Sequence, residues 1–227
     1  MYSMKTVLIT GAGRGLGKAI ATKFLVASDA LLILNTKKSA LPEFETNKRC
    51  AVIKGDLLSD EIIQELAVAA DDLDIDILIN NAGVYLNKPF CEITNKEFEN
   101  VLAINLLAPM KLTRSVWHIF KRKRIGLVIN INSITVKCDN PNEIAYAVSK
   151  CGLRGFSDVL RQDGMKDGIC VVSIYLGAMK TEMVRSREGY TKFLEPSKAA
   201  NLIFDISTGK INIDSTNEFT ISNNNKE

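Results

Sequence analysis

Short apolar runs rich in β-branched residues alternate with segments of helical length along nearly the whole chain. The runs occupy residues 6–10, 31–35, 51–53, 75–80, 127–131 and 170–175. Such runs are typical of strands buried on both faces, and strands that are joined through helices pair in parallel. Because the connections between such strands are right-handed, the pattern predicts an α/β fold with a doubly wound parallel sheet and helices on both of its faces.

The size and composition of the chain fit one domain. Its 227 residues are 46% apolar and 24% charged, and no linker rich in proline or serine and no repeat of fixed period interrupts the alternation. We therefore predict a single domain over residues 1–227, with a frayed tail at about residues 222–227.

Charge and hydropathy give little sign of a nucleic acid or a membrane as a partner. The net charge is +3, and the basic residues are mostly scattered among acidic ones. The exception, residues 121–124 (KRKR), is interpreted as a solvated helix end, with a targeting or RNA-binding patch as the alternative. The N-terminal apolar run is too short for a signal peptide, and no stretch approaches the roughly 20 apolar residues that cross a bilayer. We expect a soluble, cytoplasmic protein.

Cysteine and histidine usage does not indicate a metal site. The five cysteines form no C-x-x-C pair, and we expect buried or idle thiols. His118 is the only histidine, and with Trp117 and Phe120 beside it on a predicted helix we expect it to be a packing residue. The acidic run at residues 71–76 is interpreted as a solvated turn before a strand.

The first strand leads directly into a glycine-rich loop and then into an apolar-periodic helix. The residues from Thr10 to Gly17 fit the pattern T-G-x-x-x-G-x-G, whereas G-x-G-x-x-G cannot be placed in any register. Gly11, Gly15 and Gly17 allow a tight turn and a close approach of the backbone to a ligand. The helix N-terminus beyond them offers free N–H groups to phosphate, which predicts a diphosphate ligand and a Rossmann-like dinucleotide fold.

The end of the second strand bears on which dinucleotide is bound. An acidic residue about 20 positions after the glycines holds the ribose 2′-hydroxyl of NAD in such folds. No carboxylate occurs here between Asn35 and Ala40, whereas Lys37, Lys38 and the loop residue Arg14 could meet a 2′-phosphate. The charges favour NADP(H) over NAD(H), with solvated lysines as the alternative.

Tyr146 and Lys150 lie four positions apart in a segment that reads as the start of a helix, so their side chains share one face. A free phenol has a pKa of about 10, and a nearby ammonium stabilises the phenolate. We therefore expect Lys150 to lower the pKa of Tyr146. Ser133, which follows an apolar strand, could hold by hydrogen bonding the same substrate oxygen with which Tyr146 exchanges a proton.

Several ordered motifs resemble those of the short-chain dehydrogenase/reductase family, from Thr10 to about Ser207. They are TGAGRGLG, GDL at residues 55–57, NNAG at residues 80–83, AINLLAP, NINSIT with Ser133 thirteen residues before Tyr146, and Y-x-x-x-K. The resemblance implies a catalytic set of Asn105, Ser133, Tyr146 and Lys150. It also implies cofactor contacts from Gly11, Arg14, Gly15, Leu16, Gly17, Asn35, Lys37, Asp56, Leu57, Asn81, Ala82, Gly83, Tyr146, Lys150, Gly177 and Thr181.

Individual roles follow from the same resemblance. Asp56 would contact the adenine, and Thr181 the carboxamide of the nicotinamide. Lys150 would also bind the nicotinamide ribose, and Asn105 would anchor a water molecule of a proton relay. A homodimer or homotetramer is expected from the family.

The chain departs from the family pattern after its sixth predicted strand. Leu176 stands where the family usually has proline, so we expect a more flexible loop rather than inactivity. The segment that follows is short for a substrate lid, which suggests a small or open pocket. Arg185 and Arg187 could meet an anionic substrate there, although a solvated helix remains an equal alternative. The stretch from residue 209 to 222 can supply a last strand.

Three functions fit these observations. The first is an NADP(H)-dependent oxidoreductase that interconverts a carbonyl and a secondary alcohol by hydride transfer, with Tyr146 as proton donor or acceptor. The second is a regulatory protein that binds the nucleotide without turnover. The third is a nucleotide-sugar epimerase or dehydratase, although such enzymes usually have T-G-x-x-G-x-x-G and a longer C-terminal part. No metal is expected in any of them.

Overall fold

The structure is a computed structural model that describes residues 4–137, 141–185, 187, 189–213 and 217–222. Its sheet has seven strands in the order β3-β2-β1-β4-β5-β6-β7, and every neighbouring pair is parallel. The strands are β1 (Thr6–Ile9), β2 (Leu31–Thr36), β3 (Cys50–Lys54), β4 (Ile77–Asn80), β5 (Gly126–Ser133), β6 (Ile169–Leu176) and β7 (Glu218–Ile221). The predicted doubly wound sheet is confirmed, and each predicted apolar run lies on one of these strands.

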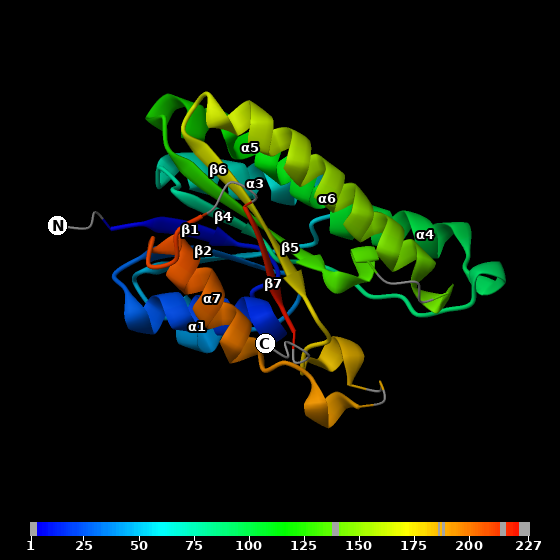
Figure 1. The fold of residues 1–227 in the computed structure, drawn as a ribbon. Coiled ribbons are helices and arrows are strands. Elements are labelled where there is room, and N and C mark those ends of the chain that lie inside the picture. The colour runs from blue at the N-terminus through cyan, green and yellow to red at the C-terminus, as the bar shows by residue number, and fades with distance from the viewer. Residues whose placement is uncertain (1–3, 138–140, 186, 188, 214–216, 223–227) are drawn as a thin grey trace.

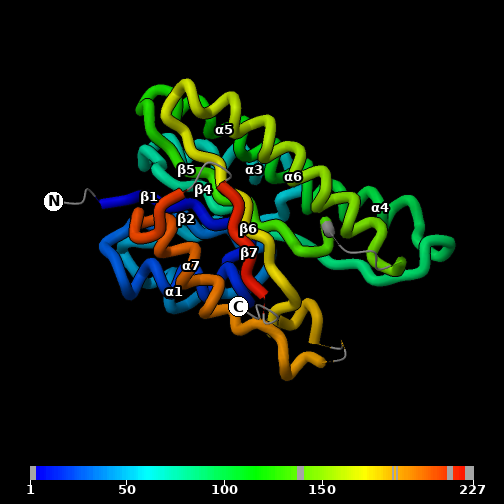
Figure 2. Tube along the Cα trace, in the orientation of Figure 1, coloured from blue at the N-terminus to red at the C-terminus, as the bar shows by residue number. Residues whose placement is uncertain are grey.

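Helices cover both faces of the sheet (Figure 1). They are α1 (Gly15–Ala27), α2 (Pro42–Glu45), α3 (Asp60–Asp72), α4 (Asn95–Leu102), α5 (Ala108–Lys123), α6 (Ile144–Met165) and α7 (Pro196–Ser207). Helices α1 and α7 pack side by side on one face, and α3, α5 and α6 lie on the other (Figure 2). The alternating side chains of strands β1 to β6 therefore enter two separate apolar cores, and Phe219 and Ile221 of β7 pack against one of them.

Buried polar side chains join the central strands to the helices above them. The Asn80 amide on β4 donates to Asn130 Oδ1 on β5 at 2.8 Å and to Thr113 Oγ1 on α5 at 3.1 Å. Asn130 in turn donates to Ser157 Oγ on α6 at 2.8 Å. Because a buried amide that loses its partner costs about 1–3 kcal/mol, this series of bonds specifies the register of β4 against β5.

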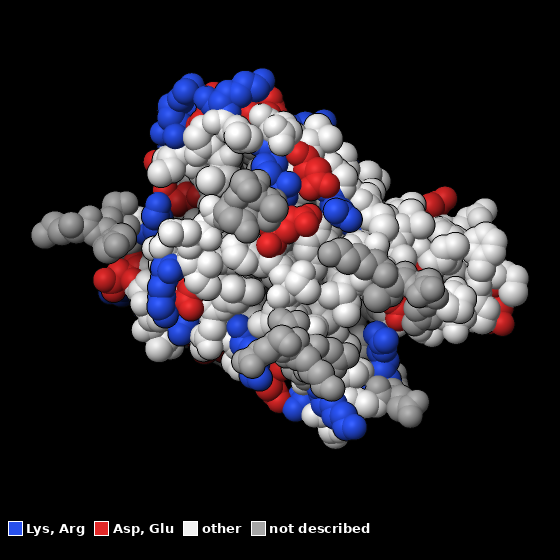
Figure 3. Space-filling view, in the orientation of Figure 1, with Lys and Arg blue, Asp and Glu red and all other residues white. Residues whose placement is uncertain are grey.

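The basic run at the end of α5 is paired rather than simply solvated. Lys123 reaches Asp76 at 2.8 Å, and Arg122 reaches Asp71 at 3.0 Å, so the two charged runs named from the sequence neutralise each other. On the face drawn in Figure 3, acidic side chains likewise lie among the lysines and arginines. The helix-end interpretation of residues 121–124 is confirmed: Lys121, Arg122 and Arg124 remain exposed to solvent and form ion pairs as well.

The expectation for His118 is wrong. The His118 side chain is 60% exposed and lies 3.7 Å from Asp71, because the buried face of α5 is formed by Leu112, Val116 and Phe120. The expectation for the cysteines is buried or idle thiols: Cys91, Cys151 and Cys170 are exposed, Cys50 is half-buried, and all four are free thiols. Cys138 lies outside the described residues, as does the predicted frayed tail beyond Ser222.

In the part of the chain that the structure describes, no helix combines the length and apolar character needed to cross a membrane.

Candidate active site

A cavity of about 740 Å³ lies at the carboxyl edge of the sheet, where open α/β folds bind ligands. The loops after β1, β2, β4, β5 and β6 all contribute to its wall. It is lined by every cofactor-binding residue predicted from the sequence, and by Ser133, Tyr146 and Lys150. Asn105 is the one predicted site residue that does not line it.

The glycine-rich loop has the shape expected of a phosphate-binding turn. Gly11 has a φ of +66°, and a Cβ there would lie 2.9 Å from the Ala82 backbone. At Gly17 a Cβ would collide with the Gly11 carbonyl oxygen, so the loop and the start of α1 pack with no room for a side chain.

The N-terminus of α1 is open toward the cavity. Its N-cap residue, Arg14, makes no side-chain cap, and no acidic side chain occupies the first turn. Gly13, Arg14, Gly15 and Leu16 all line the cavity. Unpaired N–H groups at the positive end of a 13-residue helix fit the diphosphate of a dinucleotide.

Asn35, at the end of β2, acts mainly within the protein. Its amide nitrogen donates to the Gly55 carbonyl at 3.2 Å, and its oxygen accepts from the Gly11 N–H at 3.5 Å. The side chain is buried, so it ties the glycine loop to the turn after β3. Asn35 would therefore influence a bound cofactor indirectly, by holding Gly11 in place.

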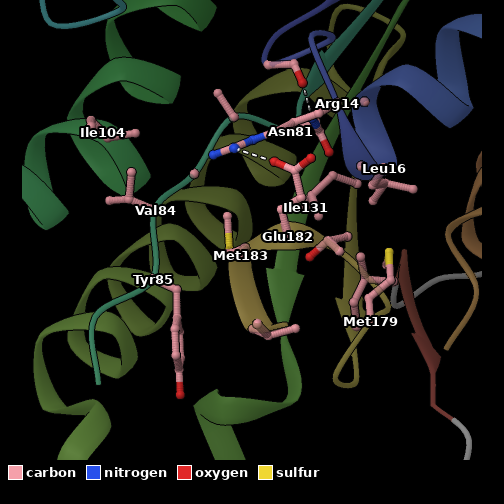
Figure 4. Close-up of a pocket in the computed structure, with 18 of the residues that line it drawn as sticks. Arg14, Leu16, Asn81, Val84, Tyr85, Ile104, Ile131, Met179, Glu182 and Met183 are labelled. Atoms are coloured by element: carbon pink, nitrogen blue, oxygen red, sulfur yellow. Dashed lines mark hydrogen bonds and ion pairs between the residues drawn. The ribbon is translucent and has the colours of Figure 1, made fainter. Parts of the chain in front are cut away.

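Two of the three cations predicted to meet a 2′-phosphate are already paired. Lys37 forms an ion pair with Asp56, and Arg14 forms one with Glu182 at 2.7 Å across the cavity mouth (Figure 4). Partial burial is the largest single influence and acts to raise the pKa of Asp56, but the hydrogen bonds from Lys37 and the Leu58 N–H, with the charges of Lys37 and Lys38, together outweigh it and the pKa is lowered. Lys38 is exposed and has no ion-pair partner among the described residues.

The segment after β4 is fastened to the glycine loop. The Asn81 amide donates to the Thr10 carbonyl at 2.8 Å, and the N–H groups of Asn81 and Ala82 both donate to Thr10 Oγ1 at 3.0 Å. These bonds explain why the motifs TGAGRGLG and NNAG occur together. They hold Ala82 and Gly83 in the cavity wall.

Asn105 lies behind this segment, in a π-helical turn between α4 and α5 (η2, Ala103–Leu107). It is fully buried, accepts from the Val84 N–H at 2.8 Å, and donates to the Val84 carbonyl at 2.9 Å and to Ser149 Oγ at 3.0 Å. Asn105 therefore links the loop after β4 to α6, close to Tyr146.

Tyr146 and Lys150 point from the first turns of α6 into the cavity, and Ser133 reaches it as the last residue of β5. The Lys150 ammonium lies 5.8 Å from the centre of the Tyr146 ring and donates to the Ile131 carbonyl at 2.8 Å. Ser133 Oγ lies 2.9 Å from Thr135 Oγ1. The three side chains predicted to act together thus converge on one wall of the cavity.

The electrostatics of this wall differ from the expectation. Burial raises the pKa of Tyr146 to about 12, although the Ser133 hydroxyl acts in the opposite direction. Burial also lowers the pKa of Lys150 to about 8. The predicted lowering of the Tyr146 pKa by Lys150 is therefore not found, because loss of water outweighs the Ser133 hydrogen bond and the charge of Arg187, which are the groups that lower it.

Sequence reasoning missed a second polar group next to Tyr146. The buried carboxylate of Glu143 accepts from the Tyr85 hydroxyl at 2.6 Å and from Thr135 Oγ1 at 3.3 Å. Tyr85 packs edge-to-face on Tyr146 with ring centres 5.2 Å apart. In the sequence, the only indication of this group is that Glu143 lies three positions before Tyr146. That spacing does not indicate that Tyr85 and Thr135 contact Glu143.

Leu176, at the position where proline was expected, is the last residue of β6 and is paired in register with Ser133 and Ile221. It is buried, and the following Gly177 N–H donates to the Ile221 carbonyl at 2.9 Å. The strand thus continues through this position. Among the described residues, no three His, Cys, Asp or Glu side chains gather into a metal-binding set.

The fold is that of a doubly wound, Rossmann-like α/β protein with a cavity at the carboxyl edge of its sheet. The sequence profile of the short chain dehydrogenases matches residues 5–190. The chain is 33% identical to acetoacetyl-CoA reductase of Shinella zoogloeoides over 80% of its own length and 77% of that protein. It superposes with a TM-score of 0.87 on 4-hydroxyisoleucine dehydrogenase complexed with NADH, at 26% identity, covering 96% of each chain.

A further similar structure is the closed form of serine dehydrogenase complexed with NADP⁺. It superposes with a TM-score of 0.85 at 24% identity, and the match covers 96% of this chain and 94% of that one. At this identity the similarity supports the fold alone. The chain belongs to the short-chain dehydrogenase/reductase family, a family of oxidoreductases. Its structural neighbours include complexes with NADH and with NADP⁺.

Proposed function

We propose that the protein is an NADP(H)-dependent oxidoreductase that interconverts a carbonyl and a secondary alcohol. The observation that carries the proposal is the convergence of Ser133, Tyr146 and Lys150 on a cavity that also contains the open N-terminus of α1. Phosphate binding and proton transfer are thereby brought together in one space. The acetoacetyl-CoA reductase relative supports carbonyl reduction as the reaction class.

Each side chain has a distinct task in this proposal. The bound dinucleotide supplies or accepts the hydride. Tyr146 donates its proton to the substrate oxygen, and a pKa of about 12 keeps that proton in place at neutral pH. Ser133 holds the same oxygen, and the Lys150 ammonium stabilises the phenolate that remains. Asn105 keeps the loop after β4 against α6, and its role in a proton relay is part of the proposal.

The preference for NADP(H) rests on the cavity wall near β2. This end contains Lys37, Lys38 and Arg14, with hydroxyl groups from Thr36 and Ser39. Asp56 and Glu182 pair with two of the cations, so a 2′-phosphate would have to exchange with these carboxylates. The uncharged 2′-hydroxyl of NAD(H) would not need to displace these carboxylates. NAD(H) is therefore the alternative cofactor.

The remaining cofactor contacts named above belong to the same proposal, as do a homodimer or homotetramer and a cytoplasmic setting. Exposed apolar side chains next to and along α5 and α6, namely Leu107, Met110, Val148 and Val159, support self-association. Size-exclusion chromatography with light scattering tests it, and a monomer at micromolar concentration would contradict it.

The test of the reaction is cofactor oxidation with a panel of ketones, oxo acids and β-keto thioesters, measured with NADPH and with NADH. Tyr146→Phe removes the proton donor and keeps the ring, so we expect turnover to fall at least a hundredfold while cofactor affinity stays within about twofold. Tight cofactor binding with no turnover that depends on Tyr146 would favour a regulatory protein. Conversion of a nucleotide sugar without net cofactor oxidation would favour an epimerase or dehydratase.

A further inference from the structure

A guanidinium group is held between two aromatic rings at the cavity wall near Tyr146. The Cζ atom of Arg187 lies 5.4 Å from the centre of the Tyr85 ring and 6.0 Å from that of Phe193. Such stacking orients a guanidinium and leaves the donors at its edge available. Arg187 lines the cavity, and its side chain is 37% exposed.

Most of the hydrogen-bonding capacity of Arg187 is unused. A guanidinium has five N–H donors, and among the described residues its one ion pair is with Glu143 Oε1 at 3.4 Å, longer than an ordinary hydrogen bond. No hydrogen bond from the guanidinium is found among the described residues. Glu143, in contrast, receives two shorter bonds from Tyr85 and Thr135. The cation, and not the carboxylate, is therefore the member with donors to offer a ligand.

The distance to Tyr146 limits the size of that ligand. A single ring, that of Tyr85, separates the guanidinium from Tyr146, with centre distances of 5.4 Å to Arg187 and 5.2 Å to the Tyr146 ring. A substrate with its carbonyl at Tyr146 could therefore place an anionic group on Arg187 only if the two groups were a few bonds apart. A carboxylate on a short carbon chain meets this condition, and a phosphate at the far end of a long carrier arm does not.

Resting on the proposed carbonyl chemistry, we propose that Arg187 is a specificity-determining residue that binds the carboxylate of a small oxo or hydroxy acid. A planar guanidinium pairs with a carboxylate through two parallel hydrogen bonds, which also orients the substrate carbonyl toward Tyr146. Arg185, two positions earlier, is exposed and does not line the cavity, so it has no part in this contact.

Glu143 has the opposite effect on the same ligand. Its carboxylate lies beside the guanidinium and competes with any anion for it, while its bonds to Tyr85 and Thr135 keep the aromatic ring in place. Removing its charge while retaining its shape should strengthen the binding of a carboxylate. Arg187 and Glu143 thus make opposite predictions, which a purely structural role for either would not produce.

The first experiment compares short oxo acids with their methyl esters, for example acetoacetate and levulinate, as substrates with NADPH. We expect the wild-type protein to prefer the acids. Arg187→Met keeps the apolar stem, and it should lower kcat/KM for the acids by about tenfold to a hundredfold while changing that for the esters by no more than about twofold. Arg185→Met is the matched control and should change neither. Equal losses for acids and esters, or no acid preference in the wild type, would overturn the proposal.

Glu143→Gln is the second variant, and it should increase the ratio of acid to ester efficiency. A decrease in that ratio would overturn the proposal, because it would mean that the Glu143 charge favours the binding of an acid instead of competing with it. The direction of this change decides the question even if the overall rate falls.

A binding measurement separates this inference from the proposed reaction. Saturation-transfer NMR with NADP⁺ present can compare valerate with methyl valerate, which have no reactive carbonyl. Valerate binding that is lost in Arg187→Met and kept in Arg185→Met supports the carboxylate site even if no Tyr146-dependent turnover is found. Turnover that depends on Tyr146, with valerate binding unchanged in Arg187→Met, would overturn the site and leave the proposed reaction standing.

Discussion

Tyr146 is surrounded by groups that favour its protonated form. Burial raises the pKa of the phenol most, and the nearby Glu143 carboxylate adds to the effect. Ser133 and Arg187 oppose the shift, and Lys150 lies one turn along the same helix with a pKa that burial lowers to about 8. A neutral tyrosine beside an ammonium that can lose its charge is well suited to donating a proton, which is the direction of carbonyl reduction.

The pH dependence of reduction should follow Lys150 rather than Tyr146. The ammonium is charged below about pH 8 and loses its charge as the pH rises, whereas Tyr146 keeps its proton to about pH 12. Because the ammonium stabilises the phenolate formed in the reaction, kcat should fall as the pH rises above about 8. Steady-state rates at saturating substrate and constant ionic strength test this.

A rate that stays level to pH 10 would contradict that expectation, since it would mean that Lys150 remains charged. Lys150→Met serves as the comparison. Its residual activity should show no fall near pH 8, because no ammonium remains to be titrated.

Lys37 and Lys38 should determine how strongly NADPH is preferred. Removing both charges in Lys37→Ala/Lys38→Ala should lower the ratio of kcat/KM for NADPH to that for NADH by about tenfold, the size of one charge-assisted hydrogen bond. Lys48→Ala, an exposed lysine away from the cavity, is the control. An unchanged ratio in the double variant would mean that neither lysine contacts the 2′-phosphate. That result would support the alternative interpretation of the sequence, in which both lysines are solvated.

Helix α4 and the π-helical turn after it form the element that carries Asn105. The helix begins with a capping box, in which Thr94 Oγ1 accepts from the Glu97 N–H at 3.3 Å and the Glu97 carboxylate accepts from the Thr94 N–H at 2.8 Å. The Thr94 N–H is the largest influence that lowers the pKa of Glu97 to about 2, followed by Lys88. The cap therefore fixes where the turn containing Asn105 begins.

Thr94→Ala should destabilise the fold by about 1 kcal/mol, because it removes the side-chain acceptor at the helix N-terminus. Urea unfolding measures the change, with Lys96→Ala on the exposed face of the same helix as the control. The difference should shrink as the pH falls from above 4.5 toward 2, because Glu97 gains its proton and the hydrogen bond that the Thr94 hydroxyl donates to its carboxylate, which the variant lacks, weakens. A loss equal to that in Lys96→Ala would exclude the cap as a source of stability.

At the scale of the whole molecule, the sheet and most of the cavity wall could be predicted from the sequence. Apolar runs mark the strands because both faces of a parallel sheet are buried, and residues at strand ends must meet at one edge. Contacts between segments that are far apart in the sequence could not be predicted, because they depend on the conformations of the loops. Arg14 and Glu182 are 168 positions apart, and the group of Tyr85, Glu143 and Arg187 comes from three separate loops.

The short final strand also bears on the order in which the chain is made. β6 is paired with β5 on one side, but its other edge is covered only by β7, which lies beyond α7 in the chain. During synthesis, β6 therefore emerges with a row of unpaired backbone groups, and these stay open until residues 218–221 arrive. A pause in translation within α7 would prolong that interval, so the nascent chain is most prone to pairing with a foreign strand while β6 waits for β7.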